Sequence, residues 1–288
     1  GMVLSRSTVR RILLQAGLSS PRRRRPPAHR LRRERFPKEG MLLQIDASRH
    51  AWLQGRGPEL TLLAVIDDAT GTVPAAVFWE REDHWGYLHI LQEVARQQGL
   101  PMALYADRHA IFWPGNHDPD TREVRTETQV GRVLRELGVR LIHAHSPQGK
   151  GRIERWWGTC QDRLVQELAW AGAATRAAAN EVLSRFVASH NRRFGQSPAE
   201  AGTAYRPWPA DLDPNRVFCL KEYRVARRDN TVLWHGDVWQ LYPSQGHPGY
   251  ARARIDVLEG PGGELTMVHK GTVIPHARAP KAKKRTAA

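Results

Sequence analysis

The amino-acid sequence predicts an α/β protein in which helices flank a mixed five-stranded sheet, followed by a small all-β barrel. Three observations predict this class. Strand-like runs follow one another over residues 41–80, helical and strand-like patterns alternate over residues 84–164, and short apolar runs separated by Gly, Asn and Asp fill residues 217–275. Sequential strands followed by alternating helices and strands are typical of a mixed sheet covered by helices.

A short amphipathic helix is predicted first, over "STVRRILLQA" at residues 7–16. Its apolar face consists of Val9, Ile12, Leu13 and Ala16. Ser7 is the expected N-cap, and Gly17 is expected to end the helix. The open face carries Arg10 and Arg11, which we expect to bind nucleic acid. This arrangement suits the second helix of a helix-turn-helix. Because only six residues precede the helix, we interpret residues 1–19 as a partial helix-turn-helix, or alternatively as a simple basic arm.

The net charge of +15 is concentrated at the two ends of the chain. Residues 1–40 hold twelve Lys or Arg against two acids, residues 276–288 hold five basic residues and no acid, and residues 41–275 are formally neutral. A neutral body with basic arms is typical of a protein that holds nucleic acid. Solvated tails are the alternative, but the prolines of "PRRRRPPAHRLRRER" prevent a simple charged helix. We expect four of its arginines to bind nucleic acid: Arg22, Arg23, Arg24 and Arg25.

The elements of the neutral body are predicted from their periodicity. We expect strands at 41–47, 60–69 and 72–80, a helix at 84–98, a strand at 102–107, a helix at 127–137, a strand at 139–144, and helices within 145–164 and at 175–193. The turn "DDATG" separates the second and third strands, and we interpret its Asp67 and Asp68 as structural.

These patterns divide the chain into five segments. We expect a partial helix-turn-helix at 1–19, an extended basic Pro/Arg linker at 20–40, an α/β core at 41–205, a β-barrel domain at 206–275 and a basic tail at 276–288. Trp234 and Trp239 are expected in the barrel core.

The cysteines and the apolar runs indicate the compartment. Cys160 and Cys219 are too few and too far apart for a disulfide framework or a zinc module, so we expect inert thiols in a reducing compartment. No apolar run approaches membrane-spanning length, and the N-terminus is arginine-rich rather than a signal peptide. We therefore expect no membrane partner and a cytoplasmic protein, associated with the nucleoid if its partner is DNA.

Three acidic residues stand where predicted elements begin or end. Asp46 closes the first strand, Asp107 closes the fourth, and Glu154 lies near the start of a long helix among basic residues. A strand-end Asp usually stabilises a turn, and a Glu in a basic cluster usually forms a surface ion pair. Because sites in α/β sheets assemble at strand ends, the alternative is that these acids form one metal site facing a polyanion.

Five segments carry a resemblance to a known family: "QIDAS", "LLAVIDDATG", "YADRHAIF", "SPQGKGRIERWWGT" and "HNRRFGQSP". Together they resemble the ribonuclease H-like integrase core of DDE transposases and retroviral-type integrases. The likeness is nearest to the bacterial insertion-sequence group called ISNCY, which has an N-terminal helix-turn-helix, a catalytic core and a C-terminal β-domain. The resemblance covers residues 40–205 well and implies a ribonuclease H-like fold for the core.

The resemblance also implies a site and a reaction. Asp46, Asp107 and Glu154 would be the catalytic acids and the metal ligands, and the partner would be double-stranded DNA bound by a homo-oligomer. Cutting a phosphodiester requires an activated water or 3′-hydroxyl and a stabilised leaving oxygen, and two divalent ions about 3.5–4 Å apart provide both. Mg²⁺ and Mn²⁺ prefer hard oxygen ligands, so three carboxylates suit two such ions.

Two features depart from the family pattern. The interval between Asp107 and Glu154 is longer than in many such enzymes, and Gly158 and Gln161 stand where retroviral integrases carry DNA-holding lysines. We therefore expect DNA to be held by three other basic residues near the glutamate: Lys150, Arg152 and Arg155. His109 is a candidate contact for a substrate phosphate. Of the adjacent Trp156 and Trp157, one is expected in the core and the other available to stack near DNA.

The main hypothesis is a transposase that cleaves phosphodiesters at transposon ends and joins the 3′-hydroxyl to target DNA by two-metal catalysis. One alternative is a catalytically silent DNA-binding regulator built on an integrase core. Another is a stand-alone ribonuclease H-like nuclease. The presence of all three acids disfavours the first alternative, and the basic ends disfavour the second.

Overall fold

The computed structural model describes residues 4–18, 34–114, 127–143, 151–244 and 246–280. The chain divides into two compact units, Gly1–Glu34 and Arg35–Ala288. The smaller unit contains one helix among its described residues, and the larger unit contains the predicted sheet and the C-terminal strands.

The helix of the smaller unit is α1 (Arg6–Gln15). Its N-cap is Ser5, whose hydroxyl accepts a hydrogen bond from the Thr8 N–H at 3.1 Å. The prediction that Ser7 is the N-cap is therefore wrong, and the helix starts two residues earlier than that prediction implies. Gly17 follows the helix with a φ of +71°, as is common for a residue that ends one. No residue of α1 is buried, so its apolar side chains are exposed.

The larger unit is built on a five-stranded sheet. Its strands are β1 (Leu43–Arg49), β2 (Thr61–Asp67), β3 (Ala75–Trp79), β4 (Ala103–Ala106) and β5 (Arg140–His143). They are ordered β3-β2-β1-β4-β5 across the sheet. β1, β2 and β3 pair antiparallel, whereas β4 pairs parallel with both β1 and β5. The mixed five-stranded sheet expected from the sequence is confirmed.

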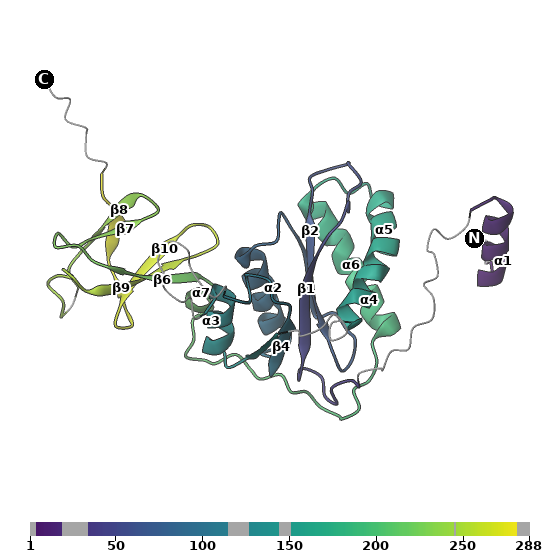
Figure 1. The fold of residues 1–288 in the computed structure, drawn as a ribbon, viewed down its shortest axis with the longest axis horizontal. Helices are drawn as coiled ribbons and strands as arrows, with labels where there is room; N and C mark the ends of the chain where they lie inside the picture. The colour runs from purple at the N-terminus through teal and green to yellow at the C-terminus, as the bar shows by residue number, and fades with distance from the viewer. Residues whose placement is uncertain (1–3, 19–33, 115–126, 144–150, 245, 281–288) are drawn as a thin grey trace, which may run out of the picture. The chain divides into compact units, whose positions relative to one another are not determined.

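Helices cover both faces of this sheet (Figure 1). One face packs against α2 (His84–Gln97) and α3 (Gln129–Glu136). The other packs against α4 (Gly151–Thr159), the π-helical turn η2 (Cys160–Leu164), α5 (Val165–Trp170) and α6 (Arg176–Phe194). Because both faces are covered, every residue of β2 is buried, which explains its continuous apolar sequence.

Helix α6 protects the edge of the sheet at β3. Asn180 accepts the Phe78 N–H at 2.7 Å and donates to the Phe78 carbonyl at 3.2 Å. Asn191 makes the same two hydrogen bonds with Val73, at 2.8 and 2.9 Å. The two amide side chains therefore satisfy backbone groups that a further strand would otherwise pair with. Asn191 lies in "HNRRFGQSP", so this motif contributes a structural contact.

Residues 35–40, which the sequence assigned to an extended linker, belong to the folded core. The Phe36 N–H donates to Asp68 Oδ2 at 3.0 Å, and the Gly40 N–H donates to Asp67 Oδ2 at 2.8 Å. The linker prediction is wrong here because the partners of this segment are carboxylates 32 and 27 residues further along the chain, which local composition does not reveal.

The C-terminal part of the chain is all-β after the short helix α7 (Pro214–Val217). Its strands are β6 (Leu220–Val225), β7 (Thr231–Trp234), β8 (Asp237–Leu241), β9 (Arg254–Glu259), β10 (Leu265–His269), β11 (Thr272–Ile274) and β12 (His276–Arg278). They form two sheets, β11-β10-β9-β6 and β12-β8-β7, around a core that contains Trp234 and contacts Trp239. The expected barrel is thus two packed sheets, and its last strand passes the predicted boundary at residue 275.

Arg132 of α3 connects the C-terminal strands to the core. It is 7% exposed, and its Nη2 donates to the carbonyls of Val217 and Cys219. Gln129 exchanges hydrogen bonds with the backbone of Lys221 at 2.9 and 3.0 Å. These contacts hold β6 against α3.

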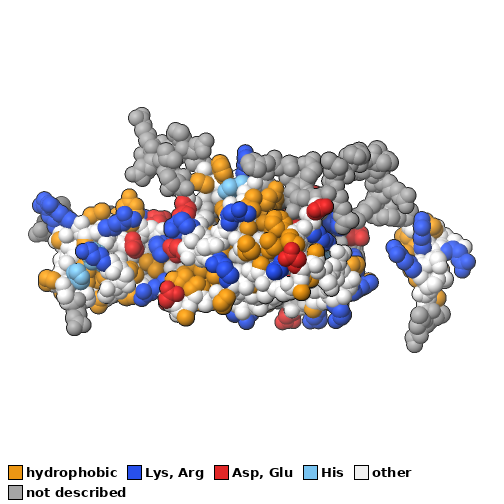
Figure 2. Space-filling model, turned by 90° about the horizontal axis from the view of Figure 1, so that it is seen from below, with side chains coloured by type: hydrophobic (Ala, Val, Ile, Leu, Met, Phe, Trp, Pro, Cys, Tyr) orange, Lys and Arg blue, Asp and Glu red, His pale blue; other side chains and the backbone are white. Residues whose placement is uncertain are grey.

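The charges on the described surface follow the distribution expected from the sequence. Figure 2 shows Lys and Arg side chains on α1, whereas on the visible face of the larger unit they are interspersed with Asp and Glu. Within the described ranges, no helix combines the length and the apolar character needed to cross a lipid bilayer.

Candidate active site

Asp46 lies on β1 and Asp107 directly follows β4, and these two strands are parallel neighbours. The register of β1 and β4 ends with Gln44 opposite Tyr105, so each aspartate stands two residues beyond this pair. Side chains two residues apart point to the same side of a sheet, and adjacent strands are about 4.8 Å apart. The two residues are therefore neighbours at the point where β1 and β4 separate, and both carboxylates act on the hydroxyl of Tyr87.

The two aspartates end their strands differently. Asp46 does not close β1, because the antiparallel pairing with β2 continues past Asp46, which faces Ala64, to Arg49. Asp107 directly follows β4, as predicted, and its Oδ1 accepts the His109 N–H at 3.0 Å. This local hydrogen bond is the turn contact expected of a strand-end Asp, and it holds the exposed His109 beside the carboxylate.

Glu154 lies in the first turn of α4, and this helix is attached to Asp46. The Trp157 indole N–H donates to Asp46 Oδ2 at 2.9 Å, and residues three apart on a helix are neighbours. Glu154 therefore lies on the side of α4 that approaches Asp46, and its side chain is exposed. Among the residues that the structure describes, no three His, Cys, Asp or Glu side chains are grouped closely enough to hold a metal ion. The two aspartates are brought together, but the third acid does not complete a cluster.

Tyr87 of α2 is a buried neighbour of this site that the sequence did not indicate. Burial raises the pKa of its hydroxyl, and the carboxylates of Glu82, Asp46 and Asp107 raise it further. The Tyr87 hydroxyl donates to Glu82 at 2.9 Å, and its ring packs edge-on against Phe112 with 4.7 Å between centroids. A tyrosine on an apolar helix face resembles any core residue in sequence, so only the fold reveals that it lies near both aspartates.

The acids of the turn after β2 are structural, as predicted. Asp67 Oδ1 accepts the Thr70 N–H at 2.8 Å. Asp68 is completely buried, accepts the side-chain N–H of Gln44 at 2.9 Å and pairs with Arg152 Nη1 at 2.8 Å. The Arg152 side chain is only 13% exposed, so this ion pair replaces the DNA phosphate expected from the sequence. Arg152 is a structural residue of α4.

The other basic residues predicted to bind DNA are distributed over both units. Arg155 is exposed on α4 next to Glu154, and Arg10 and Arg11 are exposed on α1. Five predicted DNA-binding residues lie outside the described residues: Arg22, Arg23, Arg24, Arg25 and Lys150.

Trp156 and Trp157 are both buried, with exposures of 2% and 8%. Trp156 lies in the core, as expected for one of the pair. The expectation that the other stacks near DNA is wrong, because the Trp157 indole packs inside and donates to Asp46. Cys160 and Cys219 are free and buried, and burial raises the pKa of both thiols, in agreement with the inert thiols expected.

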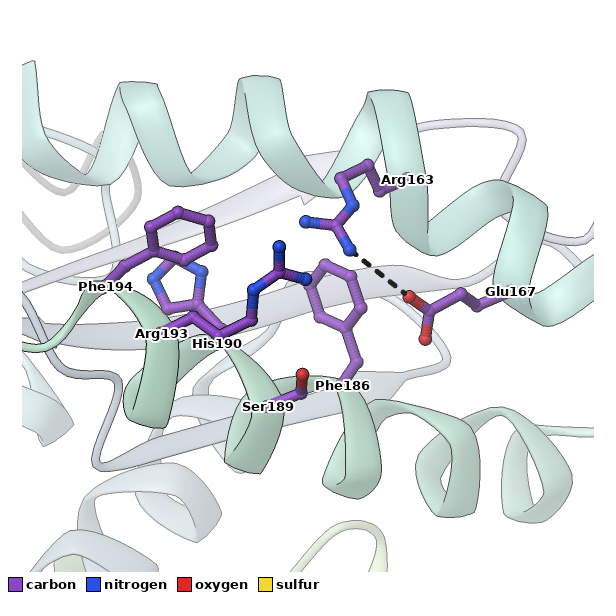
Figure 3. Close-up of a pocket in the computed structure, with 7 residues that line it drawn as sticks. All are labelled: Arg163, Glu167, Phe186, Ser189, His190, Arg193 and Phe194. Atoms are coloured by element: carbon purple, nitrogen blue, oxygen red, sulfur yellow. Dashed lines mark ion pairs between the residues drawn. The ribbon is translucent and has the colours of Figure 1, made fainter. Parts of the chain in front are cut away.

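A cavity of about 10 Å³ lies between η2, α5 and α6 (Figure 3). Arg163 approaches Glu167 to 4.0 Å at one side, and the rings of His190 and Phe194 lie 5.0 Å apart at the other. This volume is near the minimum needed to hold one water molecule, so the cavity cannot admit a nucleotide. The candidate active site is therefore not this cavity but the pair formed by Asp46 on β1 and Asp107 directly after β4.

Comparisons with known proteins relate the chain to transposases. No protein-family model matches it. It is 34% identical over 281 residues to y4bF of Sinorhizobium fredii (strain NBRC 101917 / NGR234), a protein named as a transposase. This match covers 96% of this chain and 60% of y4bF. It is 31% identical over 228 residues to the transposase for insertion sequence IS1202 of Streptococcus pneumoniae, covering 68% of this chain and 48% of that protein.

A solved structure with a similar arrangement is the catalytic core domain of BIV integrase, at 18% identity and a TM-score of 0.37, covering 55% of this chain and 88% of that one. The chain spans between about half and three-fifths of the length of the two curated relatives. The chain is thus similar over 96% of its length to one protein named as a transposase and over 68% of its length to another.

Proposed function

We propose that the chain is a DDE transposase that cleaves phosphodiesters at transposon ends and joins the 3′-hydroxyl to target DNA. The observation that carries this proposal is the placement of Asp46 on β1 and of Asp107 directly after the adjacent parallel strand β4. The helix of Glu154 is attached to Asp46 through Trp157. Homology to proteins named as transposases supports the choice of DNA as substrate.

The donor set of the proposed site fits a hard divalent cation. Two neighbouring carboxylates repel each other and present the oxygen ligands that Mg²⁺ and Mn²⁺ prefer. Asp46, Asp107 and Glu154 would hold the ions, with Glu154 contributing from α4. When bound, two such ions activate the attacking oxygen and stabilise the leaving oxygen of the phosphodiester. The role of the protein is then to hold the ions and to orient the DNA backbone.

Exposed cations beside the acids would contact the DNA backbone. Arg155 follows Glu154, Arg108 follows Asp107, and Arg49 ends β1. Arg108 also lies over the ring of Trp113, 5.4 Å from its centroid. Phosphate contacts from such residues fix the position of the duplex without reading its sequence. The arginines of residues 1–34 and Lys150 are further proposed contacts, and a homo-oligomer assembled on DNA is the proposed active form.

A cleavage assay tests this proposal. The chain is incubated with duplexes that carry the terminal sequences of its own element, in Mg²⁺ or Mn²⁺, and both nicked and joined products are measured. The proposal expects metal-dependent nicks with 3′-hydroxyl ends, followed by joining to a second duplex. Cleavage without joining would favour a stand-alone nuclease. DNA binding without cleavage at any concentration of either metal would favour the silent regulator.

A further inference from the structure

A row of three hydrogen bonds connects β1 to the helix that carries Glu154. In each, a group of α4 or η2 donates to a side chain of β1. The pairs are Ile153 N–H to Gln44 Oε1 at 3.3 Å, Trp157 Nε1–H to Asp46 Oδ2 at 2.9 Å, and Gln161 Nε2–H to Ser48 Oγ at 3.4 Å. The acceptors alternate along the strand and so share one face, while the donors recur every four residues along the helix.

The two spacings match. Two residues of a strand advance about 6.7 Å, and four residues of a helix advance about 6.0 Å, so successive donors meet successive acceptors. Sliding the helix by one residue, about 1.5 Å along its axis, would disturb all three hydrogen bonds together. The row therefore sets the position of α4 along β1, and with it the position of Glu154 relative to Asp46.

The central hydrogen bond of the row joins a buried indole to a proposed metal ligand. The neighbouring Trp156 is also buried, but its indole nitrogen has no hydrogen-bond partner in the described part of the chain. Trp156 packs instead against Phe186 and His190, with ring centroids 5.6 and 4.6 Å away. Two adjacent tryptophans of one helix thus differ in whether their N–H reaches the site.

We propose that Trp157 is a positioning residue of the active site: its indole N–H fixes the Asp46 carboxylate for metal binding and sets the register of Glu154. This inference rests on the proposed function. A carboxylate has about four lone-pair sites, and the Trp157 hydrogen bond occupies one of them. Groups that hydrogen-bond to a metal ligand orient it, and their loss typically lowers metal affinity or activity by about 10- to 100-fold.

The test compares Trp157→Phe with Trp156→Phe. Both changes keep an aromatic ring and remove one indole N–H, but only the first removes a hydrogen bond to Asp46. We expect Trp157→Phe to raise the Mg²⁺ concentration for half-maximal DNA cleavage by about 10- to 100-fold. The matched change Trp156→Phe should leave this concentration nearly unchanged, and thermal unfolding of both variants reports the purely structural effect.

A second readout needs neither DNA nor cleavage. In the full chain labelled with ¹⁵N at the tryptophan indoles, the Trp157 N–H resonance should shift when Mg²⁺ is added and when Asp46 is changed to Asn, while the Trp156 resonance stays in place. The two substitutions to Phe assign the resonances, and Asp46→Asn keeps the test valid if Trp157→Phe does not fold.

The outcomes separate this inference from the proposed function. The wild-type chain could cleave no DNA while its Trp157 resonance still responds to Mg²⁺ and to Asp46→Asn. In that case the proposed reaction is wrong, but the proposed positioning of Asp46 by Trp157 is supported. A Trp157 resonance that shifts neither with Mg²⁺ nor with Asp46→Asn overturns the inference. An unchanged Mg²⁺ dependence of cleavage in a folded Trp157→Phe variant overturns it as well.

Discussion

Asp68 is completely buried and binds groups from three separate parts of the chain. It accepts the Phe36 N–H and the Gln44 side chain, and it pairs with Arg152 in the first turn of α4. Removal of one partner from a buried ion pair leaves an uncompensated charge, which destabilises a protein by about 3–5 kcal/mol. This carboxylate therefore supports α4 although it takes no part in the proposed chemistry.

We expect Asp68→Asn to lower the free energy of unfolding by about 3 kcal/mol, because the change removes the carboxylate charge that pairs with the buried Arg152 guanidinium. Urea denaturation measures this change. The control is Glu200→Gln, which removes a pair with Lys38 at 3.7 Å in which the Glu200 side chain is 60% exposed. Exposed pairs contribute at most about 1 kcal/mol, so equal losses in the two variants would contradict a supporting role for Asp68.

At the scale of single residues, the sequence predicts positions that depend on local pattern but not contacts that depend on distant partners. The places of Asp46 and Asp107 in the fold could be predicted because each stands within or directly after an apolar strand. Arg152 and Trp157 could not, since their partners Asp68 and Asp46 are distant in sequence, 111 residues away in the case of Trp157. A basic residue and an aromatic one near a glutamate both resemble DNA contacts until the fold shows that they are buried.

At the scale of elements, the hydrophobic periodicity predicted every strand of the five-stranded sheet and the helices on its faces. It did not predict where β1 ends or that residues 35–40 are folded, because both depend on pairing with distant segments. The edge of the sheet is a similar case. Its protection by Asn180 and Asn191 depends on side chains that lie 102 and 118 residues from their partners.

We expect Asn191→Ala to lower the free energy of unfolding by about 1–3 kcal/mol, since the N–H and carbonyl of Val73 lose their partner together. Amide hydrogen exchange gives a local readout, and the Val73 N–H should exchange faster in this variant. Arg192→Ala changes the exposed neighbouring residue of the same helix and should leave that rate unchanged. Equal protection of the Val73 amide in the wild type and in Asn191→Ala would show that the edge is protected by other groups.

At the scale of the whole molecule, the positive charge lies mainly outside the folded core. The core starts at Arg35, so the arm that can be removed without disturbing it is residues 1–34, which contain ten arginines and one acid. A deletion that ended at residue 40, the boundary expected from the sequence, would also remove Phe36 and Gly40, whose N–H groups donate to Asp68 and Asp67.

We expect deletion of residues 1–34 to reduce the salt dependence of DNA binding. Each phosphate neutralised adds about 0.9 to the slope of log affinity against log salt, so contacts from about half of the ten arginines contribute roughly 4 to 5 units. Titrations of full-length and truncated chains at several salt concentrations measure the difference. The Mg²⁺ response of the Trp157 resonance should survive the deletion. A change in slope below about one unit would mean that the arm does not anchor DNA.

The proposed function requires Asp46, Asp107 and Glu154 to act together on a DNA phosphodiester. The most direct measurement is the rate of metal-dependent cleavage by Asp46→Asn, Asp107→Asn and Glu154→Gln, with DNA affinity measured on the same samples. The control is Asp162→Asn, which removes an exposed acid from η2. We expect the cleavage rate of each of the three variants to fall at least about a hundredfold, because each change removes an anionic ligand of the divalent metal ions that stabilise the transition state. The DNA affinity of these variants and the cleavage rate of Asp162→Asn should stay near the wild-type values. A near wild-type rate in any one of the three would remove that residue from the site, and near wild-type rates in all three would contradict the proposed function.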